Sequence, residues 1–137
     1  MAEWPSEPPV AESISLHKDM LTGKIKPVVY IGLAEIEEPW MLPAFTRFGG
    51  WNECPPPTVH CAAMRYWQKE YGAEICSMRF DTIECTVSAP PSTREAARQL
   101  AWQLYWYCGD IVEYGGQAIS RLAAELIDSN YWFFWWD

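Results

Sequence analysis

The sequence has few positive charges. Ten Lys and Arg residues stand against eighteen Asp and Glu residues, which gives a formal net charge of −8. A protein that binds nucleic acid needs a basic face to neutralise the phosphates, so this balance argues against a nucleic-acid-binding function. The sequence also lacks an apolar run long enough to span a membrane. No basic segment followed by an apolar stretch marks a secretory signal at the N-terminus, and we therefore expect a cytoplasmic protein.

Paired cysteines are missing as well. The cysteines are odd in number and contain no CxxC pair: Cys54, Cys61, Cys76, Cys85 and Cys108. In a chain without a secretory signal, such residues are typically reduced and mostly buried thiols. We therefore expect no disulfide framework.

The sequence is instead rich in aromatic residues, with nine Trp, seven Tyr and five Phe. Six aromatic residues follow one another at positions 131–136, directly before Asp137. Because successive side chains of a strand point to opposite faces, a strand formed by this run is apolar on both faces. We predict that this C-terminal strand is covered on both faces, lies inside the sheet rather than at its edge, and closes the fold.

The chain divides into an N-terminal extension, residues 1–26, and a single domain, residues 27–137. In the extension, helical spacing indicates a short helix that ends at Gly23, with Val10, Ile14, His17 and Leu21 at the recurring positions. The expected elements of the domain are a strand at 28–34, a short helix at 40–48, a helix at 58–72, a hairpin of two strands at 76–87, helices at 92–108 and 119–127, and the aromatic strand. This order predicts an α+β fold in which a small mixed β-sheet packs with three or four helices.

Two of these helices have recognisable ends and faces. Thr58 can cap the first helix and Gly72 can end it, and its expected apolar stripe is Val59, Ala62, Ala63, Tyr66 and Trp67. Ser92 and Glu95 have the spacing of a capping box at the start of the second. The core face expected for that helix consists of Ala96, Leu100, Ala101, Leu104 and Cys108.

Cys54, His60 and Cys61 lie within eight residues, and thiolate and imidazole are the ligands that zinc prefers. However, His60 and Cys61 are adjacent on an expected helix and point about 100° apart, and no second pair lies at zinc-finger spacing. Cys54 as a nucleophile needs a nearby imidazole and an orienting group, and the remaining histidine, His17, lies in the extension. We expect no metal, no cofactor and no catalytic residue.

Two pairs of carboxylates have close spacing. Asp81 and Glu84 lie on the hairpin, and Asp110 and Glu113 lie in the loop before the last helix. Paired carboxylates perform acid–base chemistry only where their surroundings separate their pKa values. The other interpretation, which we favour, is that Asp81 is a turn residue and Asp110 a hydrogen-bond acceptor in its loop.

Trp102 and Trp106 are one helical turn apart and offset from the face that carries Leu100 and Leu104. An exposed pair of tryptophans is the kind of surface that becomes a hot spot of a protein interface. Packing in the core is the alternative, and it is the more common fate of aromatic side chains.

Several stretches together resemble a bacterial family of domains of unknown function, number 4253. The matching stretches, which cover about residues 48–137, are Gly50-Trp51-Asn52 with Cys54-Pro55, residues 67–74, 80–83, 90–91 and 93–96, Tyr107-Cys108, residues 110–112 and residues 132–137. The closing Trp-Trp-Asp is the most specific part of the resemblance. Gly109 stands where the family pattern tends to have Pro, which loosens the loop before Asp110.

The resemblance implies a small cytoplasmic bacterial protein that binds rather than catalyses. Some small acidic domains of this kind are encoded beside secreted toxins as their antidotes. We therefore expect an immunity protein, acting as a monomer or homodimer, that occludes a basic toxin delivered by type VI or contact-dependent secretion. The residues expected to bind the toxin are Trp51, Asn52, Asp81, Glu84, Trp102, Trp106, Asp110 and Glu113. The alternative is an enzyme or small-molecule-binding domain with a pocket around residues 49–54, Asp81 and Asp110.

Overall fold

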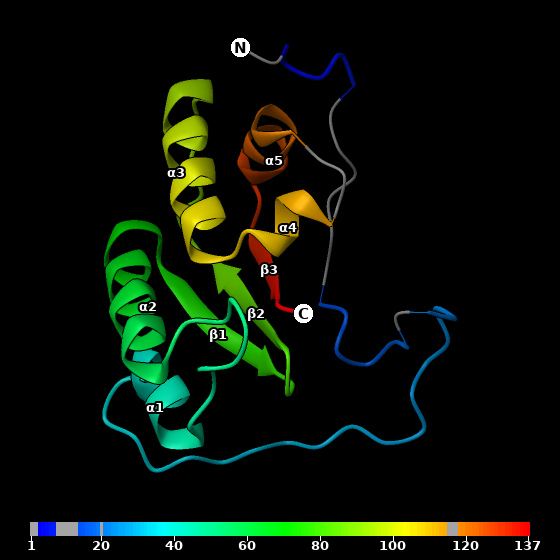
Figure 1. The fold of residues 1–137 in the computed structure, drawn as a ribbon, viewed down its shortest axis with the longest axis vertical. Coiled ribbons are helices and arrows are strands. Elements are labelled where there is room, and N and C mark those ends of the chain that lie inside the picture. Colours follow the sequence, from blue (N-terminus) through cyan, green and yellow to red (C-terminus); the bar gives the residue numbers. More distant parts are fainter. Residues whose placement is uncertain (1–2, 8–13, 20, 115–117) are drawn as a thin grey trace.

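The computed structural model describes residues 3–7, 14–19, 21–114 and 118–137 (Figure 1). Along the chain these form a 3-10 helix η1 (Pro39–Met41), α1 (Leu42–Thr46), α2 (Pro57–Tyr71), β1 (Ala73–Met78), β2 (Thr82–Val87), α3 (Arg94–Tyr107), α4 (Asp110–Glu113), α5 (Ile119–Leu126) and β3 (Tyr131–Trp135). The α+β fold predicted from the sequence is confirmed. The expected helices at 40–48, 58–72, 92–108 and 119–127 are all present, whereas α4 replaces part of an expected loop.

The sheet has the strand order β1-β2-β3, and both pairings are antiparallel. It is therefore not the mixed sheet that we expected. β2 is the central strand, with Cys85 opposite Ile75 of β1 and Trp132 of β3. β3 lies at an edge, so the prediction of an internal C-terminal strand is wrong.

The two faces of β3 differ in burial. Trp132, Phe134 and Trp136 are buried, whereas the side chains of the other face, Tyr131, Phe133 and Trp135, are half-buried. The prediction that β3 is covered on both faces therefore holds for one face only. The strand still closes the fold, because its buried face completes the hydrophobic core.

The core lies between the sheet and the helices α2 and α3, which are drawn one above the other on the same side of the sheet in Figure 1. Phe134 is fully buried where these elements meet. Trp67 of α2 stacks on its ring with centroids 5.8 Å apart, and Tyr107 of α3 meets the ring edge-on at 5.1 Å. Such aromatic pairs add about 0.5–1.5 kcal/mol each beyond the area that they bury.

Helix α2 begins and ends at residues that suit its backbone. Pro57 occupies its first turn, where the missing N–H has no intrahelical partner, so Thr58 is not the cap that we expected. Gly72 ends the helix with φ of 59°, as predicted. The buried face is shifted from the expected stripe, since Val59 and Tyr66 are exposed and the buried residues are His60, Cys61, Met64 and Trp67.

Helix α3 is close to its prediction. Thr93 rather than Ser92 is the cap, and its hydroxyl accepts the Ala96 N–H at 3.3 Å. The buried residues follow the expected helical spacing: Ala97, Leu100, Ala101, Leu104 and Tyr107.

The N-terminal part of the chain differs most from expectation. Residues 14–19 and 21–23 are not helical; instead, Lys18 and Ile25 form an isolated β-bridge, and the Lys26 N–H donates to the His17 carbonyl. Val10, the first residue of the expected helix, lies outside the described residues. Residues 28–34 form no strand and run as extended chain along the lower side of the molecule in Figure 1. Within the described ranges, no helix has both the length and the apolar character needed to cross a membrane.

Candidate functional site

Three of the predicted polar residues meet the C-terminal end of the chain. The Asn52 side-chain amide donates to the Asp137 carbonyl at 2.9 Å, and the Asp137 N–H donates to Asp110 Oδ2 at 2.9 Å. Asp81 Oδ2 accepts the indole N–H of Trp135 at 3.2 Å. Each of these side chains therefore holds the end of β3 in place.

These contacts occupy polar groups that were expected to line a pocket around residues 49–54, Asp81 and Asp110. Asp110 is buried in the first turn of α4, and Trp51 packs edge-on against Phe48 with ring centroids 5.2 Å apart. The polar groups are thus engaged with the chain itself. We assign Asp110 a structural role, in which it holds the C-terminal residues, rather than a role in contacting a partner.

Glu84 is completely buried on β2, so the expectation that it contacts a partner is wrong. Its carboxylate accepts the Ser15 N–H at 2.8 Å, the Ser15 hydroxyl, and the Tyr131 hydroxyl at 2.6 Å. Burial acts to raise the pKa of Glu84, but these hydrogen bonds outweigh it and the pKa is lowered. Glu84 therefore fastens the N-terminal segment to the outer face of the sheet.

Cys54 and His60, which the sequence placed close together, belong to a buried hydrogen-bonded group whose third member, Tyr107, was not predicted. His60 Nδ1 lies 2.6 Å from the Tyr107 hydroxyl, and His60 Nε2 lies 3.5 Å from Cys54 Sγ. All three side chains are buried. A third group orienting a Cys–His pair is the pattern of a nucleophilic site, so its protonation has to be considered.

The protonation of this group does not favour catalysis. Burial raises the pKa of Cys54 to about 12 and lowers the pKa of His60 to about 4. The thiol and the imidazole are therefore both neutral at pH 7, whereas nucleophilic cysteines act as thiolates. Among the described residues, no group of three or more His, Cys, Asp and Glu side chains is arranged to hold a metal ion. Cys54, His60 and Tyr107 form a polar part of the core.

The low pKa of His60 makes stability depend on pH. The unfolded chain binds this proton near pH 6.5 and the folded chain only near pH 4, so the stabilisation is complete above pH 6.5 and is lost as the pH falls toward 4. The expected loss is roughly 3 kcal/mol. Urea unfolding between these pH values should show a steeper decline for the wild type than for His60→Gln. The exposed His17 offers the control: His17→Gln should keep the wild-type slope, and equal slopes for all three proteins would contradict the assignment.

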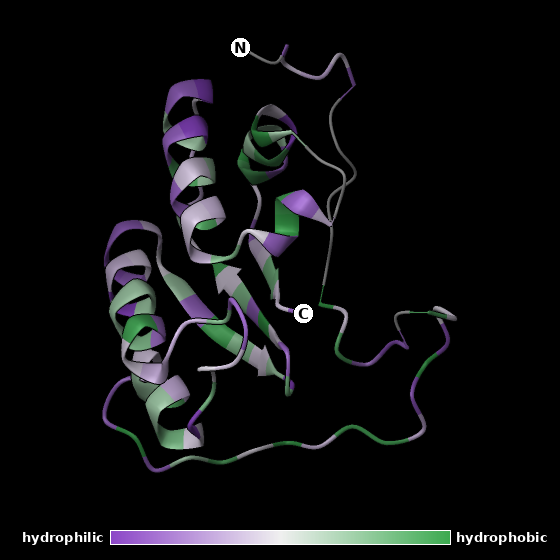
Figure 2. Ribbon diagram, viewed as in Figure 1, coloured by the Kyte–Doolittle hydropathy of each residue, from purple (hydrophilic) through white to green (hydrophobic). Residues whose placement is uncertain are grey.

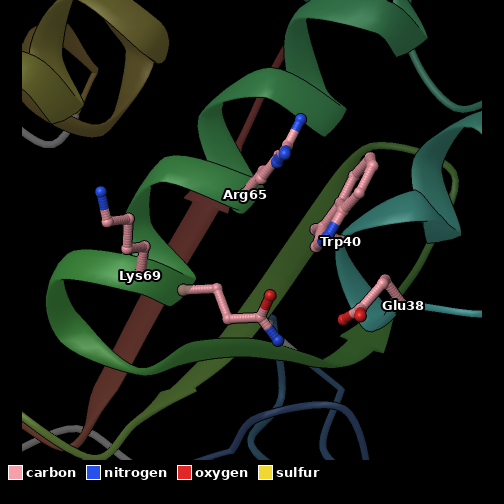
Figure 3. Close-up of a pocket in the computed structure, with 5 residues that line it drawn as sticks. Glu38, Trp40, Arg65 and Lys69 are labelled. Carbon is pink, nitrogen blue, oxygen red and sulfur yellow. The ribbon is translucent and has the colours of Figure 1, made fainter.

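A groove of about 560 Å³ lies between α2 and the segment around η1 (Figure 3). Its lining residues are Glu38, Trp40, Arg65, Gln68 and Lys69, none of which we predicted as site residues. The Arg65 guanidinium lies 5.3 Å from the centre of the Trp40 ring, and Figure 3 shows Lys69 pointing away from Trp40. The groove therefore has no set of like charges that converge on one point.

The helix α3 presents a cluster of aromatic side chains to solvent. Trp102 is 49% and Trp106 79% exposed, and their rings stack with centroids 6.5 Å apart. Tyr105 lies 5.9 Å from the first ring and 5.4 Å from the second, and its hydroxyl donates to Glu113 Oε1 at 3.0 Å. We call Trp102, Tyr105, Trp106 and Glu113 the α3 patch. Of the two interpretations of the tryptophan pair, exposure is the one that the structure supports.

The α3 patch continues a row of residues four positions apart along the helix. Arg94 and Arg98, in the preceding turns, lie over the ring of Trp4 at 4.9 and 5.4 Å. These cation–π contacts place the N-terminal segment over the first half of the row. The second half, Trp102 and Trp106, stays exposed.

Residues 30–137 match the model of a family described as Domain of unknown function (DUF4253). The match confirms the resemblance seen in the sequence and extends it from residue 48 back to residue 30. No curated protein and no solved structure matches the chain significantly.

Proposed function

We propose that this chain, which belongs to the DUF4253 family, is an immunity protein that binds a secreted bacterial toxin domain and occludes its active site. The observation that carries the proposal is the stacked and exposed Trp102–Trp106 pair of the α3 patch. Tryptophan and tyrosine dominate the energetics of protein interfaces, because they bury a large area with little loss of conformational freedom.

The side chains of the α3 patch are held in fixed conformations, as the centre of an interface requires. The two tryptophans stack on each other, and the bond from Tyr105 to Glu113 holds a third ring beside them. Groups that are already ordered lose less entropy on binding. At roughly 150–250 Å² for each buried aromatic residue, the exposed parts of Trp102 and Trp106 offer roughly 250 Å². This suits the centre of an interface that buries roughly 800 Å² of each partner.

Charge supports a basic partner. The chain has a formal charge of −8, and Glu113 places a carboxylate at the border of the α3 patch. Opposite charges steer two proteins toward each other and raise the association rate. A toxin that cleaves nucleic acid has the basic surface required for such steering.

The structure offers less support for the enzymatic alternative. Cys54 and His60 are buried and neutral, and Asp81 and Asp110 bond to the end of β3. An acid–base or nucleophilic mechanism needs groups that reach a substrate in the correct protonation state. We therefore favour stoichiometric occlusion over turnover.

Substitution of a residue of the α3 patch should leave the rates of folding and of association with the toxin unchanged, but should raise the dissociation rate of the complex. Trp106→Ala is expected to raise the dissociation rate roughly 30-fold, the effect of removing a hot-spot residue worth about 2 kcal/mol. Tyr66 of α2, 47% exposed, provides the control, since Tyr66→Ala should leave the rate within about twofold. Surface plasmon resonance with the cognate toxin domain gives both rates. Equal effects of the two substitutions would contradict an interface at the α3 patch.

A cellular experiment separates occlusion from catalysis. Cells that express the cognate toxin should survive only when the protein is present in at least an equal amount. Protection by a much smaller amount would require turnover and would reject occlusion.

A further inference from the structure

Residues 24–38, which we call the arm, expose a continuous apolar segment. Figure 2 shows hydrophobic residues along the extended chain that runs below the domain. Tyr30, Ile31 and Leu33 are 86%, 91% and 96% exposed, and Val28 and Val29 are exposed as well. Monomeric proteins rarely leave such an apolar segment uncovered, so a binding partner is expected.

The sequence of the arm suits a strand, but the described residues contain no strand that pairs with it. It is rich in β-branched and aromatic residues and holds no charge between Pro27 and Ala34. Its ends are fixed: the Lys26 N–H donates to His17, and Glu38 leads directly into η1. The arm is therefore a tethered, extended segment. Its residues 24–26 bond to residues 17–19, whereas residues 27–33 make no backbone hydrogen bond to the described part of the chain and can form a ladder with another chain.

The charges at the two ends of the arm indicate which chain pairs with it. Lys24 and Lys26 stand before the apolar segment, and Glu35, Glu37 and Glu38 stand after it. In an antiparallel pair of identical arms, the basic end of each lies beside the acidic end of the other. We propose that the arm pairs with the arm of a second copy of this chain and forms a symmetric dimer.

Symmetry and side-chain size select one register. A two-fold axis perpendicular to the ribbon requires one residue to face its own copy, and we place Ile31 on the axis. Tyr30 then lies opposite Gly32 of the other copy, and Lys24 lies opposite Glu38. A Cβ added at Gly32 would meet no atom within 4 Å, so there is room for the tyrosine ring, which shields the backbone of a glycine in a strand.

The area of the arm indicates a weak dimer. The tyrosine and four aliphatic side chains expose roughly 500 Å² per copy, so two arms can bury at most roughly 1,000 Å² in total. This value is at the lower end of specific interfaces, and a two-stranded ribbon alone is only marginally stable. Because both ends of the arm are anchored, less freedom is lost on pairing. We therefore expect dissociation in the micromolar range.

Sedimentation velocity from micromolar to submillimolar concentration tests the dimer. The wild type should pass from monomer to dimer, and Ile31→Lys, which places two ammonium groups opposite each other, should weaken dimerisation at least tenfold. Leu21, 97% exposed and outside the arm, provides the control, because Leu21→Lys should dimerise like the wild type. A wild type that stays monomeric at every concentration, or a dimer indifferent to Ile31→Lys, would overturn the proposal.

Charge reversal tests the register. Lys24→Glu and Glu38→Lys should each weaken the dimer up to about fivefold, and the double variant should restore it, since every pair then has opposite charges again. Both side chains are exposed, so the fold is unaffected, which far-UV circular dichroism checks. Failure of the double variant to recover would reject this register. These outcomes are independent of the toxin proposal.

Discussion

A chain truncated after Tyr131 should not unfold cooperatively, because it should have no packed core left. The truncation removes Trp132, Phe134 and Trp136, whose side chains are 3%, 0% and 1% exposed. Loss of one buried aromatic side chain destabilises a protein by about 3–5 kcal/mol. Three such losses sum to roughly 10 kcal/mol, which is comparable to the whole stability of a typical domain.

The contacts of these side chains explain why no neighbour can replace them. The Trp136 ring meets the rings of His60 and Tyr107 at 5.2 and 5.4 Å, and Phe134 stacks on Trp67. The truncation therefore leaves both α2 and α3 without their packing surface on the sheet. Near-UV circular dichroism should lose its aromatic bands, and urea should give no sigmoidal transition.

A point variant on the other face of the same strand is the control. Trp135 is half-buried, and Trp135→Ala should retain a cooperative transition with a loss of about 1–2 kcal/mol. A truncated chain that melted cooperatively near the wild-type midpoint would show that the helices form a core without β3.

Local patterns in the sequence were sufficient to predict those features that depend on residues close together in the chain. The spacing of Leu100, Ala101 and Leu104 defines the buried face of α3, and the left-handed backbone at Gly72 ends α2. The sequence likewise predicts the hairpin of β1 and β2, which the structure confirms. In each case the determining residues lie within one or two turns of one another. The expected alternation does not hold in β1, because a register shift between Ile75 and Ser77 leaves Cys76 exposed.

Features that depend on distant residues were not predicted. The buried face of α2 includes His60 because Tyr107, 47 residues away, supplies a hydrogen bond to its ring. Residues 28–34 have the composition of a strand, but a strand exists only where a second one pairs with it. The position of β3 at an edge, too, depends on the strand order, which apolar character alone does not determine.

The same division holds for the candidate site. The exposure of Trp102 and Trp106 was one of two interpretations of the sequence, beside the more common packing in the core, and their offset from Leu100 and Leu104 is the local signal that indicates it. The burial of Glu84 could not be predicted from neighbouring residues, because its partner Ser15 belongs to the N-terminal segment, 69 residues away. A charged residue in the middle of a strand was taken as solvent-facing, whereas three hydrogen bonds to Oε1 of Glu84 offset part of the cost of its burial.

Two adjacent glycines in the loop before α2 allow a matched test of the buried His60 group. Gly49 and Gly50 have φ of 101° and 86°, values at which a residue with a Cβ is strained. A Cβ at Gly49 would lie 2.1 Å from the Pro55 carbonyl oxygen and 2.6 Å from His60 Nε2, whereas a Cβ at Gly50 would meet no atom within 4 Å. Only the first position therefore combines backbone strain with a clash.

Gly49→Ala should destabilise the fold by about 4 kcal/mol, the sum of backbone strain and overpacking, and Gly50→Ala by about 1–2 kcal/mol from strain alone. Chemical unfolding at pH 7 gives both values. Because the clash displaces the imidazole from Tyr107, Gly49→Ala should also change the near-UV spectrum and flatten the decline of stability between pH 6.5 and pH 4. Gly50→Ala should change neither property. Equal losses in the two variants would mean that the loop moves away from His60 without cost, and that Gly49 is required only for its backbone conformation.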